Sequence, residues 1–237
     1  MTEPAPLALI DVRAGYGRIE VLHGLSIDVP AGSVVALLGR NGMGKTTTLR
    51  AISGSIPVTS GSVRLNGRRI DNRRASTIAS RGLVLVPEGR GVFPGLTVRD
   101  NLAIAHRSGG KAAGEWEGFL TSVSSAFPVL GQRLDQNAGL LSGGEQQMLA
   151  ISRALSGDPS LLMFDELSMG LAPIIVDQLM ERVAKLRDEG RTIVLVEQYL
   201  TYALRLADVC YLLAKGEVAF VGDPGELAGE TELAGYL

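Results

Sequence analysis

The stretch from Gly39 to Thr46 reads GRNGMGKT and matches the pattern GxxxxGK[ST]. It follows the apolar run Ser33 to Leu38, which is typical of a buried strand, and it leads into Thr46 to Ser53, where the spacing of apolar residues is helical. Glycines in such a loop let successive backbone N–H groups converge on phosphate oxygens, and the N-terminus of the following helix favours an anion. The order of strand, loop and helix therefore predicts a binding site for a nucleoside triphosphate.

Two side chains at the end of this loop are expected to bind phosphate and metal in addition to the backbone amides. Lys45 is suited to reach the β- and γ-phosphates, where it also serves catalysis, and the hydroxyl of Thr46 suits a Mg²⁺ ion that bridges phosphate oxygens. We therefore predict ATP and Mg²⁺ as ligands. The nucleotide is expected to contact the whole loop and the next residue, namely Gly39, Arg40, Asn41, Gly42, Met43, Gly44, Lys45, Thr46 and Thr47.

An acidic pair ends a second apolar run, Leu161 to Glu166, which reads LLMFDE. A strand in this position would carry both carboxylates to the edge of the sheet where open α/β folds bind ligands. We interpret Asp165 as an outer partner of Mg²⁺ and Glu166 as the group that polarises the water attacking the γ-phosphate. The alternative is a pair of residues that caps the N-terminus of a helix.

A third motif, LSGGEQQ at Leu141 to Gln147, joins a serine and two glycines to a following helix and predicts a second anion site. By itself it also fits an ordinary loop before a helix. In the order found here it resembles the signature motif of ABC-type ATPases, and the resemblance covers essentially the whole chain. A GTPase or a nucleoside kinase with the same phosphate loop predicts neither this motif nor an acidic pair just after it.

The resemblance implies a nucleotide site shared by two chains. In that family two subunits associate head to tail, so Ser142, Gly143 and Gly144 would act on the nucleotide held by the other subunit. Tyr16, in the sequence GYG, matches the aromatic residue that stacks on adenine, although an ordinary core or turn tyrosine is the alternative. Ser168 to Leu171 matches the loop after the catalytic glutamate.

Two positions depart from the general family pattern. Glu88 in VPEGR stands where most members have glutamine, and its match implies contact with the nucleotide and with Mg²⁺; an exposed loop charge is the alternative. Gln198 in LVEQ stands where most members have histidine, so a neutral amide would sense the γ-phosphate during catalysis. Together with DELSMGLAPIIV, these segments resemble ATPase subunits of high-affinity branched-chain amino acid importers, and urea importer ATPases are close relatives.

Two further departures affect the surroundings of the catalytic residues. Leu167 replaces the usual proline, a change that could loosen the loop holding Ser168, and Tyr199 replaces the usual asparagine after Gln198. We still expect hydrolysis of ATP, because Lys45 and both carboxylates are present.

The bulk composition argues against several other classes. The chain has 23 basic and 25 acidic residues, a net charge of −2, and no cationic field that would attract nucleic acid. The arginine-rich stretch Arg68 to Arg81 is interspersed with Asp71 and predicts a solvated surface. His23 and His106 lack partners at the spacing of zinc ligands and are expected to be structural or surface residues. The only cysteine, Cys210, lies in an apolar run and predicts a buried residue in a reducing compartment.

The predicted fold class is α/β, a single ABC ATPase domain over residues 1–237. The core is expected to be of P-loop NTPase type, with an N-terminal antiparallel β part, and to span about 1–87 and 156–237. A helical subdomain is expected to be inserted over about 88–155. Further strands are predicted at Leu7–Val12, Leu25–Val29, Ser62–Leu65, Leu83–Val86, Leu161–Phe164, Thr192–Val196, Val209–Leu213 and Glu217–Val221. Further helices are predicted at Thr97–His106, Glu115–Phe127, Gln146–Leu155 and Ile174–Glu189.

The resemblance also implies partners and a location. The chain has no run of about 20 apolar residues that could span a membrane. It is expected at the cytoplasmic face of the cell membrane, with a second ATPase subunit, identical or related. The segment Glu88 to Asn101 would grip integral-membrane permease subunits, and an extracytoplasmic binding protein would deliver the solute. The alternatives are another amino-acid, amide or urea importer, a soluble ABC ATPase of cofactor assembly or repair, and a scaffold that does not hydrolyse ATP.

Overall fold

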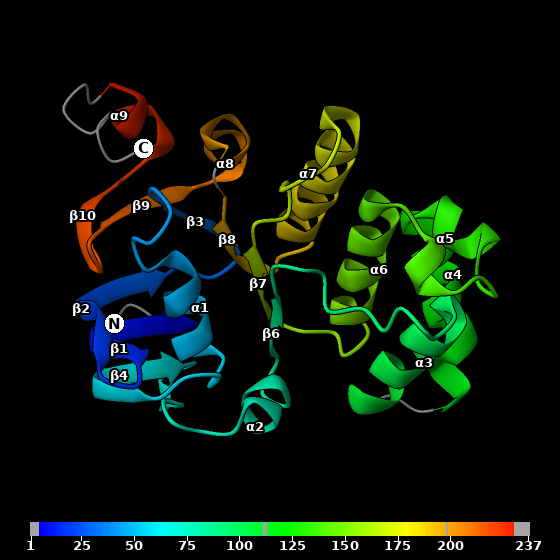
Figure 1. Cartoon of the computed structure of the whole chain (residues 1–237), viewed down its shortest axis with the longest axis horizontal. Coiled ribbons are helices and arrows are strands. Elements are labelled where there is room, and N and C mark those ends of the chain that lie inside the picture. The colour runs from blue at the N-terminus through cyan, green and yellow to red at the C-terminus, as the bar shows by residue number, and fades with distance from the viewer. Residues whose placement is uncertain (1–4, 111–112, 198, 230–237) are drawn as a thin grey trace.

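The computed structural model describes residues 5–110, 113–197 and 199–229 of the chain. These residues form an antiparallel sheet at one end of the molecule, a mixed sheet in the middle and a group of helices at the other end (Figure 1). Segments far apart in the sequence therefore meet at the middle sheet, which carries the elements expected to bind nucleotide.

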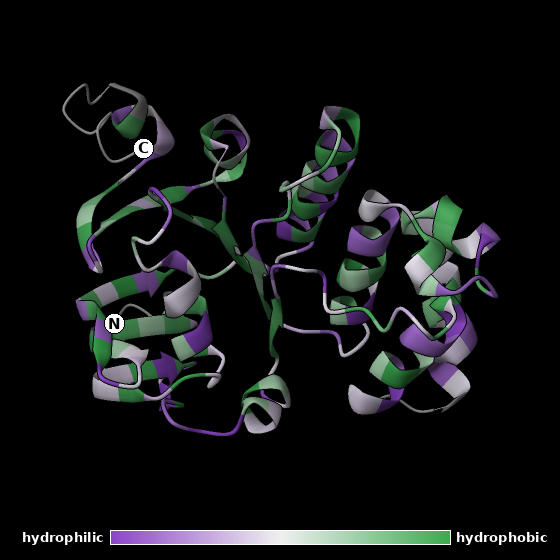
Figure 2. Cartoon of the chain, in the orientation of Figure 1, coloured by the Kyte–Doolittle hydropathy of each residue, from purple (hydrophilic) through white to green (hydrophobic). Residues whose placement is uncertain are grey.

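The middle sheet has six strands in the order β10-β9-β3-β8-β7-β6, and only the edge strand β10 runs antiparallel to its neighbour. Every residue of β3, β7 and β8 is buried, as expected for apolar strands covered on both faces, and Figure 2 shows the apolar colouring along them. Because the parallel strands share one direction, β3, β8, β7 and β6 all end at the same edge. The strand bounds are β3 (Val34–Leu38), β6 (Leu83–Val86), β7 (Leu161–Asp165), β8 (Thr192–Val196), β9 (Val209–Ala214) and β10 (Glu217–Gly222).

The smaller sheet is antiparallel, with strand order β2-β1-β4-β5. Strand β1 continues well beyond the predicted end at Val12, because the pairing passes through irregular positions between Leu9 and Arg13. Such bulges shift the alternation of buried and exposed residues, so a strict two-residue period ends the strand too early. The bounds are β1 (Leu7–Tyr16), β2 (Ile19–Val29), β4 (Val58–Leu65) and β5 (Arg68–Arg69).

Helix α1 packs between the two sheets, against β1, β2 and β7. Helices α7 and α8 contact each other, and α8 also contacts β3 and α9. Cys210 of β9 is buried and free, and its burial raises the pKa of the thiol to about 11, so it is a packing residue and not a nucleophile. The bounds are α1 (Lys45–Ile52), α2 (Ala75–Ala79), α7 (Pro173–Asp188), α8 (Leu200–Leu206) and α9 (Pro224–Gly229).

The group of helices at the far end consists of α3 (Val98–Ser108), α4 (Trp116–Ala126), α5 (Pro128–Gln132) and α6 (Gly143–Leu155). Short 3-10 turns at Ala113–Glu115 and Ala138–Leu140 connect them. Helix α3 starts where Thr97 Oγ1 accepts a hydrogen bond of 3.0 Å from the N–H of Asp100, a typical N-cap. His106, predicted to be structural or exposed, is buried and stacks on Phe119.

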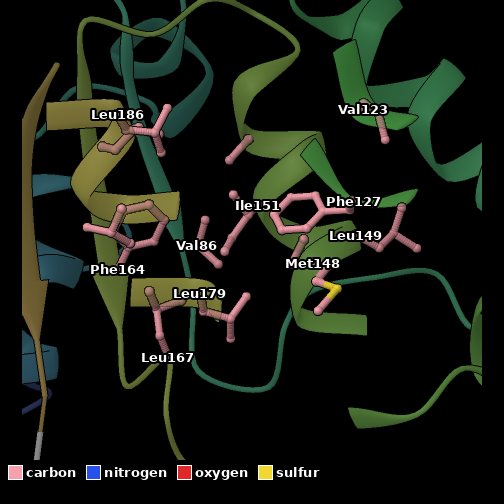
Figure 3. Packing of buried hydrophobic residues seen from close by; sticks show 14 of the residues in the cluster. Val86, Val123, Phe127, Met148, Leu149, Ile151, Phe164, Leu167, Leu179 and Leu186 are labelled. Carbon is pink, nitrogen blue, oxygen red and sulfur yellow. The ribbon is translucent and has the colours of Figure 1, made fainter. Parts of the chain in front are cut away.

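One apolar core joins these helices to the middle sheet. Figure 3 shows Phe164 of β7 and Leu179 of α7 beside Val86 and Ile151, with Phe127 on the far side of Ile151. Helix α6, which carries the signature motif, packs against β6 and α7, and β6 is the neighbour of β7, the strand that leads into the acidic pair. Among the described helices, none is long and apolar enough to cross a membrane.

Candidate functional site

The phosphate loop lies between β3 and α1 and needs glycine at several positions. Gly39, Gly42 and Gly44 have φ values of 132°, 82° and 105°, in the region that favours glycine. A side chain at Gly39 would also place its Cβ 2.5 Å from the carbonyl oxygen of Leu213. The sequence pattern therefore reflects backbone geometry, and the loop turns back over the end of the sheet before α1 begins.

The hairpin turn between β9 and β10 holds this loop from the side. The N–H of Gly216 donates to the carbonyl of Met43 at 3.1 Å, and the Gly216 carbonyl accepts from the N–H of His23 at 3.0 Å. A Cβ at Gly216 would lie 1.8 Å from the carbonyl oxygen of Val21, so only glycine allows this approach. The loop is thus fixed before any nucleotide binds.

Lys45 lies inside the loop that precedes it. Its Nζ donates to the carbonyl oxygens of Gly39 at 2.5 Å and Arg40 at 3.0 Å. Burial lowers the pKa of Lys45, while Glu166 and Asp165 oppose this change. The ammonium group is held inside the loop by hydrogen bonds to neutral carbonyl oxygens. An ionised phosphate oxygen is a stronger acceptor than these carbonyls and can replace them.

The acidic pair follows β7 at the same sheet edge. Asp165 Oδ1 accepts a hydrogen bond of 3.1 Å from Thr46 Oγ1, and burial raises the pKa of Asp165 to about 6, with smaller contributions from Glu166 and Glu88. Glu166 has a φ of 54°, which is unusual for a residue other than glycine, and its N–H donates to the carbonyl of Val196 at 2.9 Å. This hydrogen bond continues the β7–β8 pairing by one residue and fixes the start of the glutamate turn.

A cleft of about 420 Å³ lies between the loop, the acidic pair and the antiparallel sheet. It has both apolar and charged walls, as expected for a base at one end and phosphates at the other. Its lining residues are Tyr16, Val21, Asn41, Gly42, Gly44, Lys45, Thr46, Thr47, Glu88, Glu166 and Met169.

The cleft brings together most of the site residues predicted from the sequence. Three of the predicted loop residues, Gly39, Arg40 and Met43, do not line the cleft. The carbonyl oxygens of Gly39 and Arg40 accept hydrogen bonds from Lys45 Nζ. Met43 is partly buried and packs against the apolar core. Val21 and Met169 line it and were not predicted, because an isolated apolar residue carries no motif. Gln198 lies outside the described residues.

Tyr16 stands at the rim of the cleft, with 40% of its surface exposed. Its hydroxyl accepts a hydrogen bond of 3.1 Å from Arg50 Nη1 and lies 3.5 Å from Thr47 Oγ1. These contacts hold the phenol at its hydroxyl end. The guanidinium of Arg50 also lies over the ring, with Cζ 5.9 Å from its centroid, and the exposed part of the ring faces the cleft as an apolar surface.

The signature motif lies at the start of α6, and its three key residues are not among those that line the cleft. Ser142 Oγ accepts from the N–H of Glu145, whose carboxylate accepts from the N–H of Ser142 at 2.8 Å. This capping box orients the helix N-terminus. A Cβ at Gly144 would lie 2.5 Å from Ile175 Cγ2, so glycine there is required for packing against α7.

A further buried carboxylate, Glu197, was missed from the sequence. It follows β8 and accepts hydrogen bonds from Ser168, one from the N–H at 3.1 Å and one from the hydroxyl. The signal was present, since Glu197 directly follows an apolar strand just as Glu166 does. The suggestion that Leu167 loosens this loop is wrong, because Leu167 is buried in the apolar core and Ser168 is fastened by both donors.

The ligands expected for Mg²⁺ are present in a suitable combination. Hydroxyl and carboxylate oxygens are ligands that Mg²⁺ prefers. Thr46 Oγ1 and Asp165 Oδ1 supply one of each and lie 3.1 Å from one another. Glu88 and Glu166 line the same cleft, which strengthens the negative potential there. The residues therefore fit a divalent cation.

Comparisons with known proteins agree with this geometry. Residues 22–168 match the ABC transporter family. The chain is 45% identical over 212 residues, 90% of each chain, to the high-affinity branched-chain amino acid transport ATP-binding protein BraG of Pseudomonas aeruginosa. It is 39% identical over 222 residues, 93% of each chain, to the probable branched-chain amino acid transport ATP-binding protein LivF of Archaeoglobus fulgidus.

A solved structure of an ATP binding subunit of an ABC transporter is also similar. The TM-score is 0.85 at 29% identity, and the match covers 98% of this chain and 95% of that one. The family match includes the phosphate loop, the signature motif and the acidic pair. The chain therefore belongs to the ABC transporter family, as one of its ATP-binding and ATP-hydrolysing subunits.

Proposed function

We propose that this chain energises an ABC importer of branched-chain amino acids from the cytoplasmic face of the membrane. The observation that carries the proposal is the identity of 45% and 39% to two branched-chain amino acid transport ATP-binding proteins along nearly their entire lengths. The segments around Glu88 and Gln198 support the same assignment, because they depart from the general family pattern in the way expected of this branch.

In the proposed mechanism the loop amides and Lys45 bind the phosphates of ATP, and Tyr16 stacks on the adenine. Glu166 accepts a proton from the attacking water, and the amide of Gln198 contacts the γ-phosphate. Thr46, Asp165 and Glu88 would hold Mg²⁺, which neutralises charge on the phosphates when it is bound. The fixed geometry of Glu166 supports its role, since its turn is held by Val196.

The cleft of one chain does not include the signature residues. Ser142, Gly143 and Gly144 begin α6 and do not line it, which supports their action on the nucleotide of a second ATPase subunit, identical or related. ATP would then hold two chains together, and loss of the γ-phosphate on hydrolysis would release them.

We infer separate roles for two parts of the chain, a nucleotide-binding core and a helical subdomain. Residues of about 1–87 and 156–237 would form the nucleotide-binding core. Residues of about 88–155 would form a helical subdomain that contacts integral-membrane permease subunits through Glu88–Asn101. An extracytoplasmic binding protein would deliver the solute to the permease.

Two experiments test this function. The tagged chain should co-purify from membranes with permease subunits, and a strain lacking it should lose high-affinity uptake of radiolabelled leucine, with urea uptake as the control. Replacing Glu166 with Gln should abolish that uptake without reducing the amount of assembled complex. Recovery of the chain with a soluble complex alone, or normal leucine uptake in the deletion strain, would overturn the proposal.

A further inference from the structure

The loop that follows Glu88 contains a rare backbone turn. Gly89, Arg90 and Gly91 have φ values of 81°, 70° and 62°, and the N–H of Gly91 donates to the carbonyl of Gly89 at 2.8 Å. A three-residue turn with a positive φ at its central residue is strained, and here that residue is an arginine. Strain of this kind persists only where surrounding contacts impose it.

The contacts that impose it come from the signature helix α6. Arg90 Nη1 donates to Gln146 Oε1 at 2.8 Å, and Gln146 Nε2 donates in turn to the carbonyl of Leu141 at 3.3 Å, directly before the signature serine. Arg153, one of the last residues of α6, donates to the carbonyl of Gly91. The turn is therefore attached to both ends of α6.

The guanidinium of Arg90 also packs on the first residue of α6. A Cβ at Gly143 would lie 2.8 Å from Arg90 Nη2, so the guanidinium lies directly against this residue. The planar guanidinium can hold Gln146 and cover Gly143 at the same time, which the point charge of a lysine does less well. Arg90 thus sets the position of the helix N-terminus relative to the loop.

The two elements joined by Arg90 serve different nucleotides in the proposed mechanism. Glu88, two residues before Arg90, lines the cleft of its own chain, whereas Gly143 is expected to contact the nucleotide of the other subunit. A rigid link between them makes the position of one depend on the other, and such coupling is reciprocal.

We propose that Arg90 is a positioning residue that ties the Glu88 loop to the signature helix and so couples the two nucleotide sites of the dimer. The inference rests on the proposed function, because it requires a site completed by a second chain. Arg90 does not line the chain's own cleft, whereas Glu88 does, so loss of Arg90 should weaken the association of two chains more than it weakens the binding of ATP to one chain.

The test uses the full-length Glu166→Gln variant, which binds ATP without consuming it. Sedimentation velocity measures its ATP-dependent dimerisation, and calorimetry under conditions that keep the chain monomeric measures ATP affinity. Arg90→Ala should weaken dimerisation about tenfold, a typical size for the coupling between two sites, with a smaller loss of ATP affinity. Arg107→Ala, an exposed arginine at the end of α3, is the matched control and should change neither.

A double-mutant cycle then identifies the partner of Arg90. Gln146→Ala should weaken dimerisation to a similar extent, and the double variant should be no worse than either single one. Three results would overturn the inference: dimerisation of Arg90→Ala equal to that of the parent, a parallel loss of ATP affinity, or independent effects of the two substitutions. Failure of the parent itself to dimerise would instead overturn the shared site on which the proposed function rests.

Discussion

Glu197 and Ser168 fasten the end of one central strand to the turn that follows its neighbour. The carboxylate of Glu197 accepts the N–H of Ser168 at 3.1 Å and also its hydroxyl, and both residues are buried. The N–H of Glu166 donates to Val196 in the same region. The glutamate turn is therefore attached to the end of β8 at two points, and any movement at that end is transmitted to it.

Removing the carboxylate should release this turn. Glu197→Ala leaves the buried N–H and hydroxyl of Ser168 without their acceptor, which is expected to lower the free energy of unfolding by about 2 kcal/mol or more and to reduce ATP turnover. Glu197→Gln offers an amide oxygen to the N–H and an amide N–H to the hydroxyl oxygen, so it should retain most of both properties. Urea unfolding and steady-state turnover measure the effects. Equal stability of the Ala and Gln variants would contradict the role given to this pair.

The same carboxylate makes stability depend on pH. Burial raises the pKa of Glu197 to about 7 from an ordinary 4.5, so the folded protein binds this proton more tightly than the unfolded chain. Its contribution to stability is therefore complete below the ordinary pKa and is lost as the pH rises through about 7. Relative to wild type, Glu197→Gln should gain stability between about pH 5 and pH 8, by about 3 kcal/mol at most.

Urea titrations across that range check the sign. The difference in free energy of unfolding between Glu197→Gln and wild type should grow in favour of the variant as the pH rises. A difference that stays constant, or one that moves in favour of wild type, would show that the pKa of this carboxylate is not raised.

The role of Tyr16 can be separated from that of its hydroxyl. Tyr16→Ala removes the exposed ring and should weaken ATP binding about tenfold, the usual effect of losing one stacked base. Tyr16→Phe loses the hydrogen bond from Arg50 but keeps the ring, so its ATP affinity should stay within about threefold of wild type. Calorimetry with ATP and with inorganic triphosphate separates the contributions. Unchanged ATP affinity in Tyr16→Ala would make this residue an ordinary turn tyrosine.

The contact between Gly144 and Ile175 makes a packing prediction about the signature helix. Gly144→Ala puts a methyl group within 2.5 Å of Ile175 Cγ2, so α6 or α7 must shift, at an expected cost of about 1–3 kcal/mol in stability. Ile175→Val still carries a γ-methyl and should relieve little of this cost, whereas Ile175→Ala should relieve most of it. Additive losses in the Gly144→Ala/Ile175→Ala double variant would rule out the contact as the cause.

Much of the fold could be predicted because its central strands are continuous apolar runs. Thr192–Val196 and Leu83–Val86 have the predicted bounds, and β7 extends the predicted strand by only one residue. The helices α2, α5 and α8 were missed, because five to seven residues are too few to display a helical period. Their positions are set by the elements they pack against, which no local pattern records.

Site residues could be predicted only where they belong to a recognisable sequence motif. Lys45, Thr46 and the acidic pair could be identified because their spacing is fixed by the loop and by the end of β7. Glu197 and Arg90 stood within quoted segments, LVEQ and VPEGR, but their roles depend on partners 29 and 56 residues away. Such contacts follow from the order of strands in the sheet and from the packing of α6, which single-sequence patterns do not specify.

The central claim is that ATP is bound between two chains, with Ser142 of one facing the phosphates held by the other. Ser142→Asp keeps a good N-cap for α6 but adds a negative charge toward the γ-phosphate, and Ser142→Asn is the neutral control. The decisive measurement is the mass in solution of the Glu166→Gln chain with saturating ATP, alone and with each substitution. A shared site predicts that Glu166→Gln and its Ser142→Asn form have the mass of two chains. The Ser142→Asp form should have the mass of one ATP-loaded chain. A single-chain mass for Glu166→Gln would contradict a site shared by two copies of this chain, and an undiminished dimer in the Ser142→Asp form would contradict the place of Ser142 in that site.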